Sequence, residues 1–340
     1  LLFFSSCKEK TKAPSFYYFE LLSLEGNTVA FGEDIKLKVN LLNASEEDVA
    51  SYKVFVDNKL AEAEVKQSSI TIPTSTLQLG VKKVYLKATF TDEKTLTKSR
   101  NITILSDRSP QKLSYTIVNV FPHDKKSYTQ GLEFSNDVLY ESAGKYGVSS
   151  LRKTDFRTAK VLQSIPLSKN YFGEGITFFN DLIYQLTWRE MTCFVYNKSD
   201  FSLLKTFQYP KRIQGWGICS SRDELIMSDG TEYLHIMNPS NFSEKRTVQV
   251  YDDKGPIQLL NELEYVNGNI FANVYTTDSI VVINPKLGRV EGVLDLSRLL
   301  KPEDMHSEID VLNGIAYHKK RGTYFVTGKN WPKMYELKID

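Results

Sequence analysis

The chain has 340 residues, a length that favours two domains over one. Hydrophobic residues make up 41% of it and charged residues 25%, so the chain can bury a normal core. With 43 basic and 41 acidic side chains the net charge is only +2 and no basic stripe stands out, so nothing favours a nucleic-acid partner. Tyr and Phe, 19 of each, suit strands more than helices.

The first residues differ in character from the rest. Residues 1–4 are apolar, two serines follow, and then come Cys7 and a charged run. This order resembles the lipobox of a bacterial lipoprotein, with Phe4 where Leu is usual, and it suggests that the printed sequence begins inside a signal peptide. Acylation of Cys7 would then hold an extracytoplasmic protein to the membrane by a lipid anchor only, in the periplasm or at the outer membrane. The alternative is an ordinary trimmed signal peptide with an incidental cysteine. Residues 1–14 are assigned to this signal remnant, the cysteine and a polar tether.

Two further cysteines, Cys193 and Cys219, lie in contexts typical of strand interiors. Without a CxxC spacing they favour neither a zinc site nor a disulfide scaffold. They could pair in an oxidising compartment, but two buried free thiols are the simpler interpretation.

Residues 15–105 show apolar and polar side chains in alternation. Ile35, Leu37, Val39 and Leu41 alternate with polar neighbours, and about seven such segments are separated by turn residues. A period of two predicts strands that are buried on one face. About seven short strands in ninety residues favour an immunoglobulin-like β-sandwich. It contains no catalytic pattern, so it is a spacer or a module that binds a partner.

Residues 106–112 are expected to be a linker, and residues 113–340 repeat themselves. A short motif recurs about every 45 residues. Its equivalent positions form a first column: Gln130, Glu174, Trp216, Glu262 and Asn313. A second column follows, five residues past the opening of the next apolar run: Gly144, Trp188, Gly230, Tyr275 and Lys329.

Each repeat holds four short strand patterns, which predicts a five-bladed β-propeller. The strand over residues 115–120 precedes the first repeat and is expected to complete the last blade, which removes an open sheet edge. Two separate sandwiches are the alternative, and the regular spacing disfavours them. In a propeller the innermost strands face the central channel, so both columns should meet near one mouth. Carboxylate, amide, ammonium and aromatic groups would then share a small polar-ligand site.

The repeats also resemble the plant-type glutaminyl-peptide cyclotransferase family. The resemblance runs from about Tyr115 to Leu337, in family order, through stretches 121–132, 171–177, 185–188, 215–217, 260–264, 273–278, 310–317 and 325–333. It implies a five-bladed propeller that acts on peptides or proteins with an N-terminal glutamine. The glutamine becomes pyroglutamate and ammonia is released, with no cofactor and no catalytic metal.

The resemblance also assigns roles to particular residues. Glu174 matches the family's catalytic glutamate, and Phe172, Trp188 and Trp216 match its aromatic pocket. Polar groups of the substrate site match at Gln130, Asn261 and Lys329. Tyr128 stands where members carry Phe, and Tyr275 stands where plant members carry Trp. These changes are expected to affect substrate affinity more than the type of reaction.

The residues suit that chemistry. Ring closure needs the neutral α-amine to attack the side-chain amide, and an α-amine with a pKa near roughly 7.7–8.0 is partly neutral at physiological pH. Aromatic walls can hold the near-attack geometry, and one carboxyl, Glu174, can move the proton from the attacking nitrogen to the departing ammonia. Lys329 or the amides of Asn261 and Gln130 can stabilise the oxyanion.

Two other functions are compatible with the sequence. One is a propeller with the same pocket that binds peptide N-termini without turning them over, and Tyr275 is the best argument for that. A propeller hydrolase would need calcium or paired carboxylates, for which Glu174 and Glu262 are the candidates. His123 suits a structural role, and His235, His306 and His318 show no metal-ligand spacing.

Overall fold

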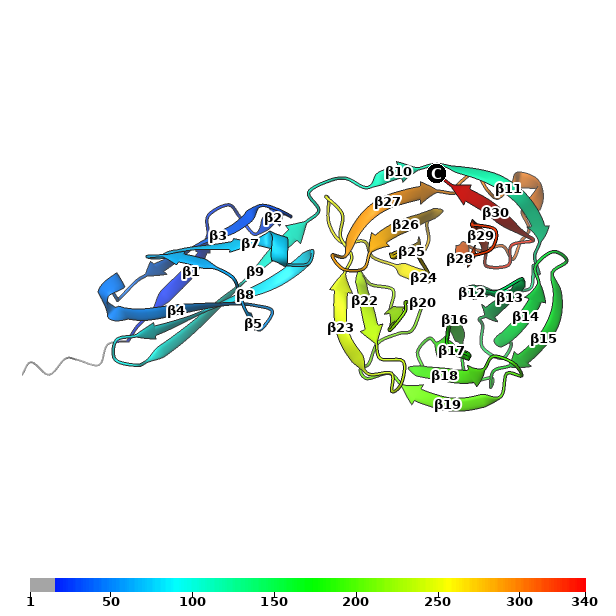
Figure 1. Ribbon diagram of the computed structural model, residues 1–340, viewed down its shortest axis with the longest axis horizontal. Helices are drawn as coiled ribbons and strands as arrows, with labels where there is room; N and C mark the ends of the chain where they lie inside the picture. Colours follow the sequence, from blue (N-terminus) through cyan, green and yellow to red (C-terminus); the bar gives the residue numbers. More distant parts are fainter. Residues whose placement is uncertain (1–15) are drawn as a thin grey trace, which may run out of the picture. The chain divides into compact units, whose positions relative to one another are not determined.

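The computed structural model describes residues 16–340, and nearly all of its regular structure is β-strand (Figure 1). Its helices are three single 3₁₀ turns: Glu46–Asp48, Thr74–Thr76 and Pro302–Asp304. None of the helices among the described residues is long and apolar enough to cross a membrane. Cys193 and Cys219 are free and buried within strands, which confirms the prediction of two buried thiols.

The described part of the chain divides into two compact units: residues 16–76 with 81–104, and residues 77–80 with 105–340. The smaller unit holds two sheets. The first has the order β1-β3-β7-β6 and the second β2-β9-β8-β4-β5. The strands are β1 (Phe19–Ser23), β2 (Thr28–Ala30), β3 (Asp34–Leu41), β4 (Val49–Val56), β5 (Lys59–Leu60), β6 (Glu64–Lys66), β7 (Ser69–Pro73), β8 (Gly80–Phe90) and β9 (Thr95–Leu105).

The alternation in this unit corresponds to one buried face per sheet. Ile35, Leu37 and Val39 on β3 are buried, as are Val84 and Leu86 on β8. The described part of the unit has nine strands where about seven were expected. Three of the nine, β2, β5 and β6, have only two or three residues, too few to produce a readable alternation.

The larger unit is a ring of five sheets around a common centre (Figure 1). The first sheet holds β12 (Thr129–Ser135), β13 (Val138–Ala143), β14 (Ser150–Asp155) and β15 (Lys160–Pro166). The second holds β16 (Gly173–Phe179), β17 (Leu182–Thr187), β18 (Thr192–Asn197) and β19 (Leu203–Gln208). The third holds β20 (Ile218–Ser220), β21 (Leu225–Ser228), β22 (Tyr233–Met237) and β23 (Glu244–Gln249). In each sheet the chain starts at the innermost strand and moves outward.

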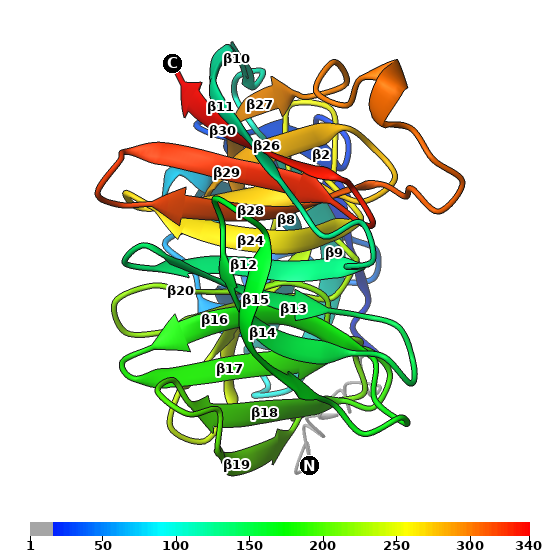
Figure 2. The ribbon, with the colours of Figure 1, turned by 90° about the vertical axis from the view of Figure 1, so that its right-hand side faces the viewer.

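The last two sheets each include one strand that comes from the beginning of the unit. The fourth holds β24 (Leu260–Val266), β25 (Asn269–Val274), β26 (Ser279–Asn284) and β27 (Arg289–Asp295), with β10 (Gln111–Leu113) added in parallel on β27. The fifth holds β28 (Leu312–His318), β29 (Thr323–Gly328) and β30 (Lys333–Ile339). Its outer strand is β11 (Tyr115–Pro122), which pairs antiparallel with β30 (Figure 2).

This pairing confirms that the strand before the first repeat completes the last sheet. The stretch expected to be a linker, residues 106–112, instead includes the start of β10.

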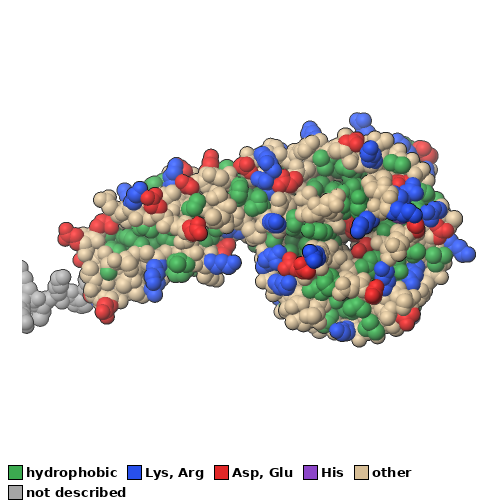
Figure 3. All heavy atoms as spheres, in the orientation of Figure 1, with side chains coloured by type: hydrophobic (Ala, Val, Ile, Leu, Met, Phe, Trp, Pro, Cys, Tyr) green, Lys and Arg blue, Asp and Glu red, His purple; other side chains and the backbone are tan. Residues whose placement is uncertain are grey.

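The core of the ring lies between the sheets. Five apolar clusters are present, one for each pair of neighbouring sheets, and the last joins the fifth sheet to the first. In that last cluster Leu132 and Leu139 pack with Phe325. Burial of each such side chain stabilises the fold by roughly 1.5–3 kcal/mol, so the ring is held closed by packing as well as by β11. Basic and acidic side chains are interspersed on the face seen in Figure 3.

Candidate active site

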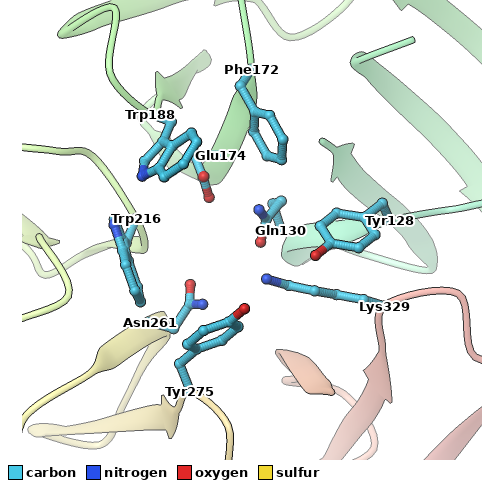
Figure 4. A pocket seen from close by; sticks show the side chains of 9 residues that line it. All are labelled: Tyr128, Gln130, Phe172, Glu174, Trp188, Trp216, Asn261, Tyr275 and Lys329. Carbon is cyan, nitrogen blue, oxygen red and sulfur yellow. The ribbon is translucent and has the colours of Figure 1, made fainter. Parts of the chain in front are cut away.

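A cavity of about 230 Å³ lies at the centre of the ring, beside the first residues of the inner strands (Figure 4). Every one of the five sheets contributes to it. It is lined by Tyr128, Gln130, Phe172, Glu174, Trp188, Trp216, Asn261, Tyr275 and Lys329. These are all nine residues that the sequence assigned to catalysis and substrate binding, and the structure brings them together. Cys7, assigned to lipidation, lies outside the described residues.

Irregular strand pairing places polar side chains in the cavity. In four of the five sheets the register between the first and second strands shifts at the same place, near the start of the first strand. The residues skipped by the pairing include Gln130, Glu174 and Asn261. A β-bulge leaves its extra residue out of the ladder and changes the direction of the side chain. These three side chains therefore reach the cavity from bulges.

The second column lies beside the first. Trp188, Tyr275 and Lys329 directly follow the last residues of β17, β25 and β29. From the sequence, these residues were expected just past the start of the second strand of each sheet. Because β17, β25 and β29 are each only six residues long, the three residues lie just past the strand ends instead. The backbone N–H of each residue donates to a carbonyl just ahead of the first strand of its sheet: those of Phe172, Leu259 and Val311, at 3.1, 2.8 and 2.9 Å.

The two glycines of the second column provide space. A Cβ atom on Gly144 would lie 2.5 Å from Cε1 of Phe172, and one on Gly230 would lie 2.6 Å from Cε2 of Trp216. Two aromatic rings of the cavity thus lie against glycine backbone. These positions contribute to the site without lining it.

Two first-column residues bond elsewhere. Glu262 accepts the backbone N–H of Leu132 at 3.1 Å and that of Ile315 at 2.8 Å, so its carboxyl joins three inner strands. It was a candidate partner of Glu174 for hydrolysis, but Asn261 lines the cavity in its place. Asn313 lies behind the cavity wall and contacts Gln130.

Aromatic rings form most of the cavity wall. Phe172 and Trp188 lie with ring centroids 5.6 Å apart, and Trp216 meets Tyr275 edge to face at 5.4 Å. Tyr128 meets Phe172 edge to face at 6.3 Å. Such walls exclude water and lower the local dielectric, which strengthens every charge effect inside.

Glu174 and Lys329 carry the opposite charges of the cavity. Glu174 is 4% exposed and Lys329 is 3% exposed. Burial raises the pKa of Glu174 well above its ordinary value, against the pull of the Lys329 charge, and Glu190 raises it further. Burial lowers the pKa of Lys329, while Glu174 and Asp310 oppose that change. Figure 4 shows both side chains pointing into the cavity from opposite sides. A carboxyl with a raised pKa can exchange a proton near neutral pH.

The amides are oriented by their surroundings. Asn313 donates from Nδ2 to the backbone oxygen of Thr129 at 3.0 Å and to Oε1 of Gln130 at 3.2 Å. With that oxygen engaged, the amino group of Gln130 is left to donate into the cavity. Asn261 is buried, and its Oδ1 has no hydrogen-bond partner among residues 16–340. A ligand with an N–H group would satisfy that oxygen.

Comparison with known proteins decides the family. A family model described as glutamine cyclotransferase matches residues 86–339. The chain belongs to this family. It is 41% identical over 228 residues to a glutaminyl-peptide cyclotransferase of Arabidopsis thaliana, which covers 66% of this chain and 70% of the relative.

A solved structure agrees. The crystal structure of Myxococcus xanthus glutaminyl cyclase is similar to this one with a TM-score of 0.63 and 34% sequence identity, covering 68% of this chain and 98% of that one. The family predicted from the motifs is therefore confirmed.

Three further residues support this cyclotransferase-family site and were not singled out from the sequence. Gln214 accepts hydrogen bonds from Trp188 and Trp216, Asp310 accepts one from Tyr128, and Glu190 accepts the backbone N–H of Phe172. Gln214 and Glu190 are separated from a predicted site residue by a single residue, which is the only signal that could have found them. Asp310 lies in a long loop, where nothing in the sequence indicates its partner.

The histidines bond to protein groups. His123 is buried, with Nδ1 2.8 Å from the backbone oxygen of Trp331 and Nε2 3.2 Å from Glu141. His235 lies between Asp229 and Glu244. Within residues 16–340, no group of three or more His, Cys, Asp or Glu side chains is arranged to hold a metal ion.

Proposed function

We propose that this protein is a glutaminyl-peptide cyclotransferase, which converts the N-terminal glutamine of peptides or proteins to pyroglutamate and releases ammonia. The observation that carries the proposal is the gathering of Glu174, Lys329 and two amide side chains inside an aromatic cavity. At about 230 Å³ the cavity is smaller than the roughly 300–1,000 Å³ of drug-sized ligand sites. It suits one terminal residue, with the rest of the peptide outside.

The first step is ring closure. The α-nitrogen of the substrate attacks the carbon of its own side-chain amide, forming the new C–N bond of a five-membered ring. Trp188, Trp216 and Phe172 fold the side chain back on the amine, which supplies the near-attack geometry. The charge that develops on the amide oxygen is met by the Lys329 ammonium and the Gln130 amino group.

Proton transfer completes the reaction. The Glu174 carboxylate accepts the proton that the attacking nitrogen must lose and gives it to the departing nitrogen, whose bond to carbon breaks as ammonia leaves. The active state is therefore the Glu174 carboxylate beside a neutral amine. The raised pKa of Glu174 makes this carboxylate a stronger base than an ordinary one, so it can take the proton from the attacking nitrogen and then release it to the departing nitrogen.

Three finer features belong to the proposal. The ring of five sheets is a five-bladed β-propeller, supported by the outward strand order and by the five inter-sheet clusters. The smaller unit is an immunoglobulin-like sandwich, supported by its two sheets and one-sided burial. The protein is an extracytoplasmic lipoprotein anchored through Cys7, and loss of fatty-acid labelling in a Cys7→Ala variant of the full chain would test this.

The decisive experiment is incubation of the purified protein with a Gln-initiated peptide, with and without a chelator. We expect ammonia release and a matching loss of peptide mass, unaffected by the chelator. Binding of the peptide without ammonia release would instead favour a binding module. A lactone is tested in the same way, and lactone cleavage that the chelator abolishes would favour a propeller hydrolase.

A further inference from the structure

One amide oxygen accepts hydrogen bonds from both tryptophans of the cavity. Oε1 of Gln214 lies 2.6 Å from Nε1 of Trp188 and 3.0 Å from Nε1 of Trp216. The two indoles come from different sheets, at the end of β17 and ahead of β20. Gln214 thus connects two walls that no continuous strand connects.

Hydrogen bonds hold the backbone that follows Gln214 in place, so the Gln214 side chain starts from a fixed position. Gly215 donates its N–H to the backbone oxygen of Trp188 at 3.1 Å, and Trp216 donates its own to Ser228 at 3.1 Å. A Cβ atom on Gly215 would lie 2.2 Å from the hydroxyl of Tyr209, so the chain passes here in close contact with the second sheet.

The other contacts of the indoles are made by ring faces and edges. The Arg189 guanidinium lies 3.8 Å from the Trp188 ring centre, and Tyr275 meets Trp216 edge to face. Such contacts resist tilting of a ring but tolerate rotation within its plane. A hydrogen bond at Nε1 fixes that rotation. Because Gln214 uses both indole N–H groups, neither is free to bind the substrate.

We propose that Gln214 is a positioning residue for the cyclisation, because its side-chain oxygen fixes the in-plane orientation of both indoles. The cavity then offers aromatic surface at Trp188 and Trp216, and recognition of the substrate's polar atoms falls to Glu174, Gln130, Asn261 and Lys329. This inference rests on the proposed function and adds a residue that does not line the cavity.

Two substitutions separate the role of the oxygen from that of side-chain size. Gln214→Met removes the acceptor at nearly constant length, and Gln214→Glu retains an acceptor for both N–H groups. Gln163→Met is the matched control, because Gln163 lies on the outer strand β15 and bonds Lys153 and Asp200 there.

The readout is hydrogen exchange of the indole N–H protons by NMR. The chain has 3 Trp, so three indole signals are expected, and Trp188→Phe and Trp216→Phe variants assign them by loss of one signal each. Trp331 donates its indole N–H to the Asp310 backbone oxygen and serves as an internal reference.

In Gln214→Met we expect exchange at Trp188 and Trp216 to become about tenfold faster, the effect of losing one ordinary hydrogen bond, with Trp331 unchanged. We expect kcat/KM to fall about 10- to 100-fold, mainly through kcat, because the near-attack geometry loosens. Gln214→Glu should keep slow exchange and most of the activity, and Gln163→Met should match the wild type in both.

Unchanged exchange in Gln214→Met, equal acceleration at all three indoles, or wild-type kcat/KM would each overturn the proposal, as would equally fast exchange in Gln214→Glu. If the wild type turns over no Gln-initiated peptide, the proposed function fails, while the exchange data still decide whether Gln214 fixes the indoles.

Discussion

The Lys329 ammonium lies 4.7 Å from the centre of the Tyr275 ring. Tyr128 meets the same ammonium at 4.9 Å, so the charge is held by two aromatic rings as well as by the field of Glu174. Two aromatic faces attract the ammonium and so oppose the effect of burial on the pKa of Lys329, and they hold the ammonium in place for a developing oxyanion. Tyr275, the largest departure from the plant pattern, is therefore part of the lysine's surroundings.

We expect Tyr275→Trp to lower KM for a Gln-initiated peptide a few-fold, with little change in kcat. Trp offers a larger face to both the ammonium and the substrate. Steady-state kinetics check this, and Tyr275→Phe, which keeps ring size, separates the hydroxyl from the ring. A higher KM in the Trp variant would contradict the prediction.

Glu174→Gln should reduce kcat by about 10²–10⁴-fold, because an amide cannot carry the proton between the two nitrogens. The fold should be retained, since Gln has the same shape as Glu. In addition, no basic side chain of the described residues lies within 4 Å of the Glu174 carboxyl as an ion-pair partner. Ammonia release and thermal melting are the measurements. The exposed Glu303→Gln is the control and should behave as wild type.

Glu190→Gln should lower the pKa of Glu174. The Glu190 charge raises that pKa by like-charge repulsion, so its removal favours the carboxylate. The limb of the kcat/KM profile that reports Glu174 in the free enzyme should then move to lower pH. The limb of the profile that reports the substrate amine should stay at about pH 7.7–8.0. A Glu174 limb that is unmoved or displaced upward would refute the assignment.

Gly144→Ala should lower kcat/KM about tenfold or more, because the added methyl would displace Phe172 from the cavity wall. Gly144 has an ordinary backbone conformation, so Ala should cause no backbone strain there. Gly292→Ala is the control, since its methyl would meet the flexible end of Leu113 on an outer strand and would lie at an ordinary contact distance of 3.4 Å from the Gln111 backbone oxygen. Equal activities of the two variants would argue against a role for this space.

Glu133→Gln should change how stability depends on pH. Burial raises the pKa of Glu133 from 4.5 to about 8. Below pH 4.5 both the folded and unfolded states hold the proton; between pH 4.5 and 8 the unfolded state ionises first, so the free energy of unfolding of the wild type falls as pH rises. Gln cannot ionise, so the variant should melt higher than wild type at pH 8 and similarly at pH 4. Parallel melting curves across this range would contradict the prediction.

Most of the site could be predicted because the repeat is built from strands. Equivalent positions in successive sheets occupy equivalent places around the centre, so Gln130, Glu174 and Trp216 could be aligned from spacing alone. The bulges could not be predicted, since skipping one or two residues leaves no periodic signal. That is why Glu262 was aligned with the cavity while Asn261, its neighbour, enters it.

Features that depend on a single long-range partner were also invisible in the sequence. Strand β10 has three residues and exists only because β27 pairs with it. Gln214 and Asp310 act through side-chain hydrogen bonds made from loops, where hydrophobic periodicity carries no information. The sequence thus predicted which residues line the site better than it predicted the hydrogen bonds and strand pairings that hold them in place.

The pairing of β11 with β30 has a consequence for biosynthesis. Lys329 belongs to the sheet that is finished last, and β30 follows it in the chain. Because β11 is made more than two hundred residues earlier, it must wait unpaired on the ribosome until residues through Ile339 have emerged. The catalytic centre of the nascent protein therefore cannot be complete before β30 has been made and has paired with β11.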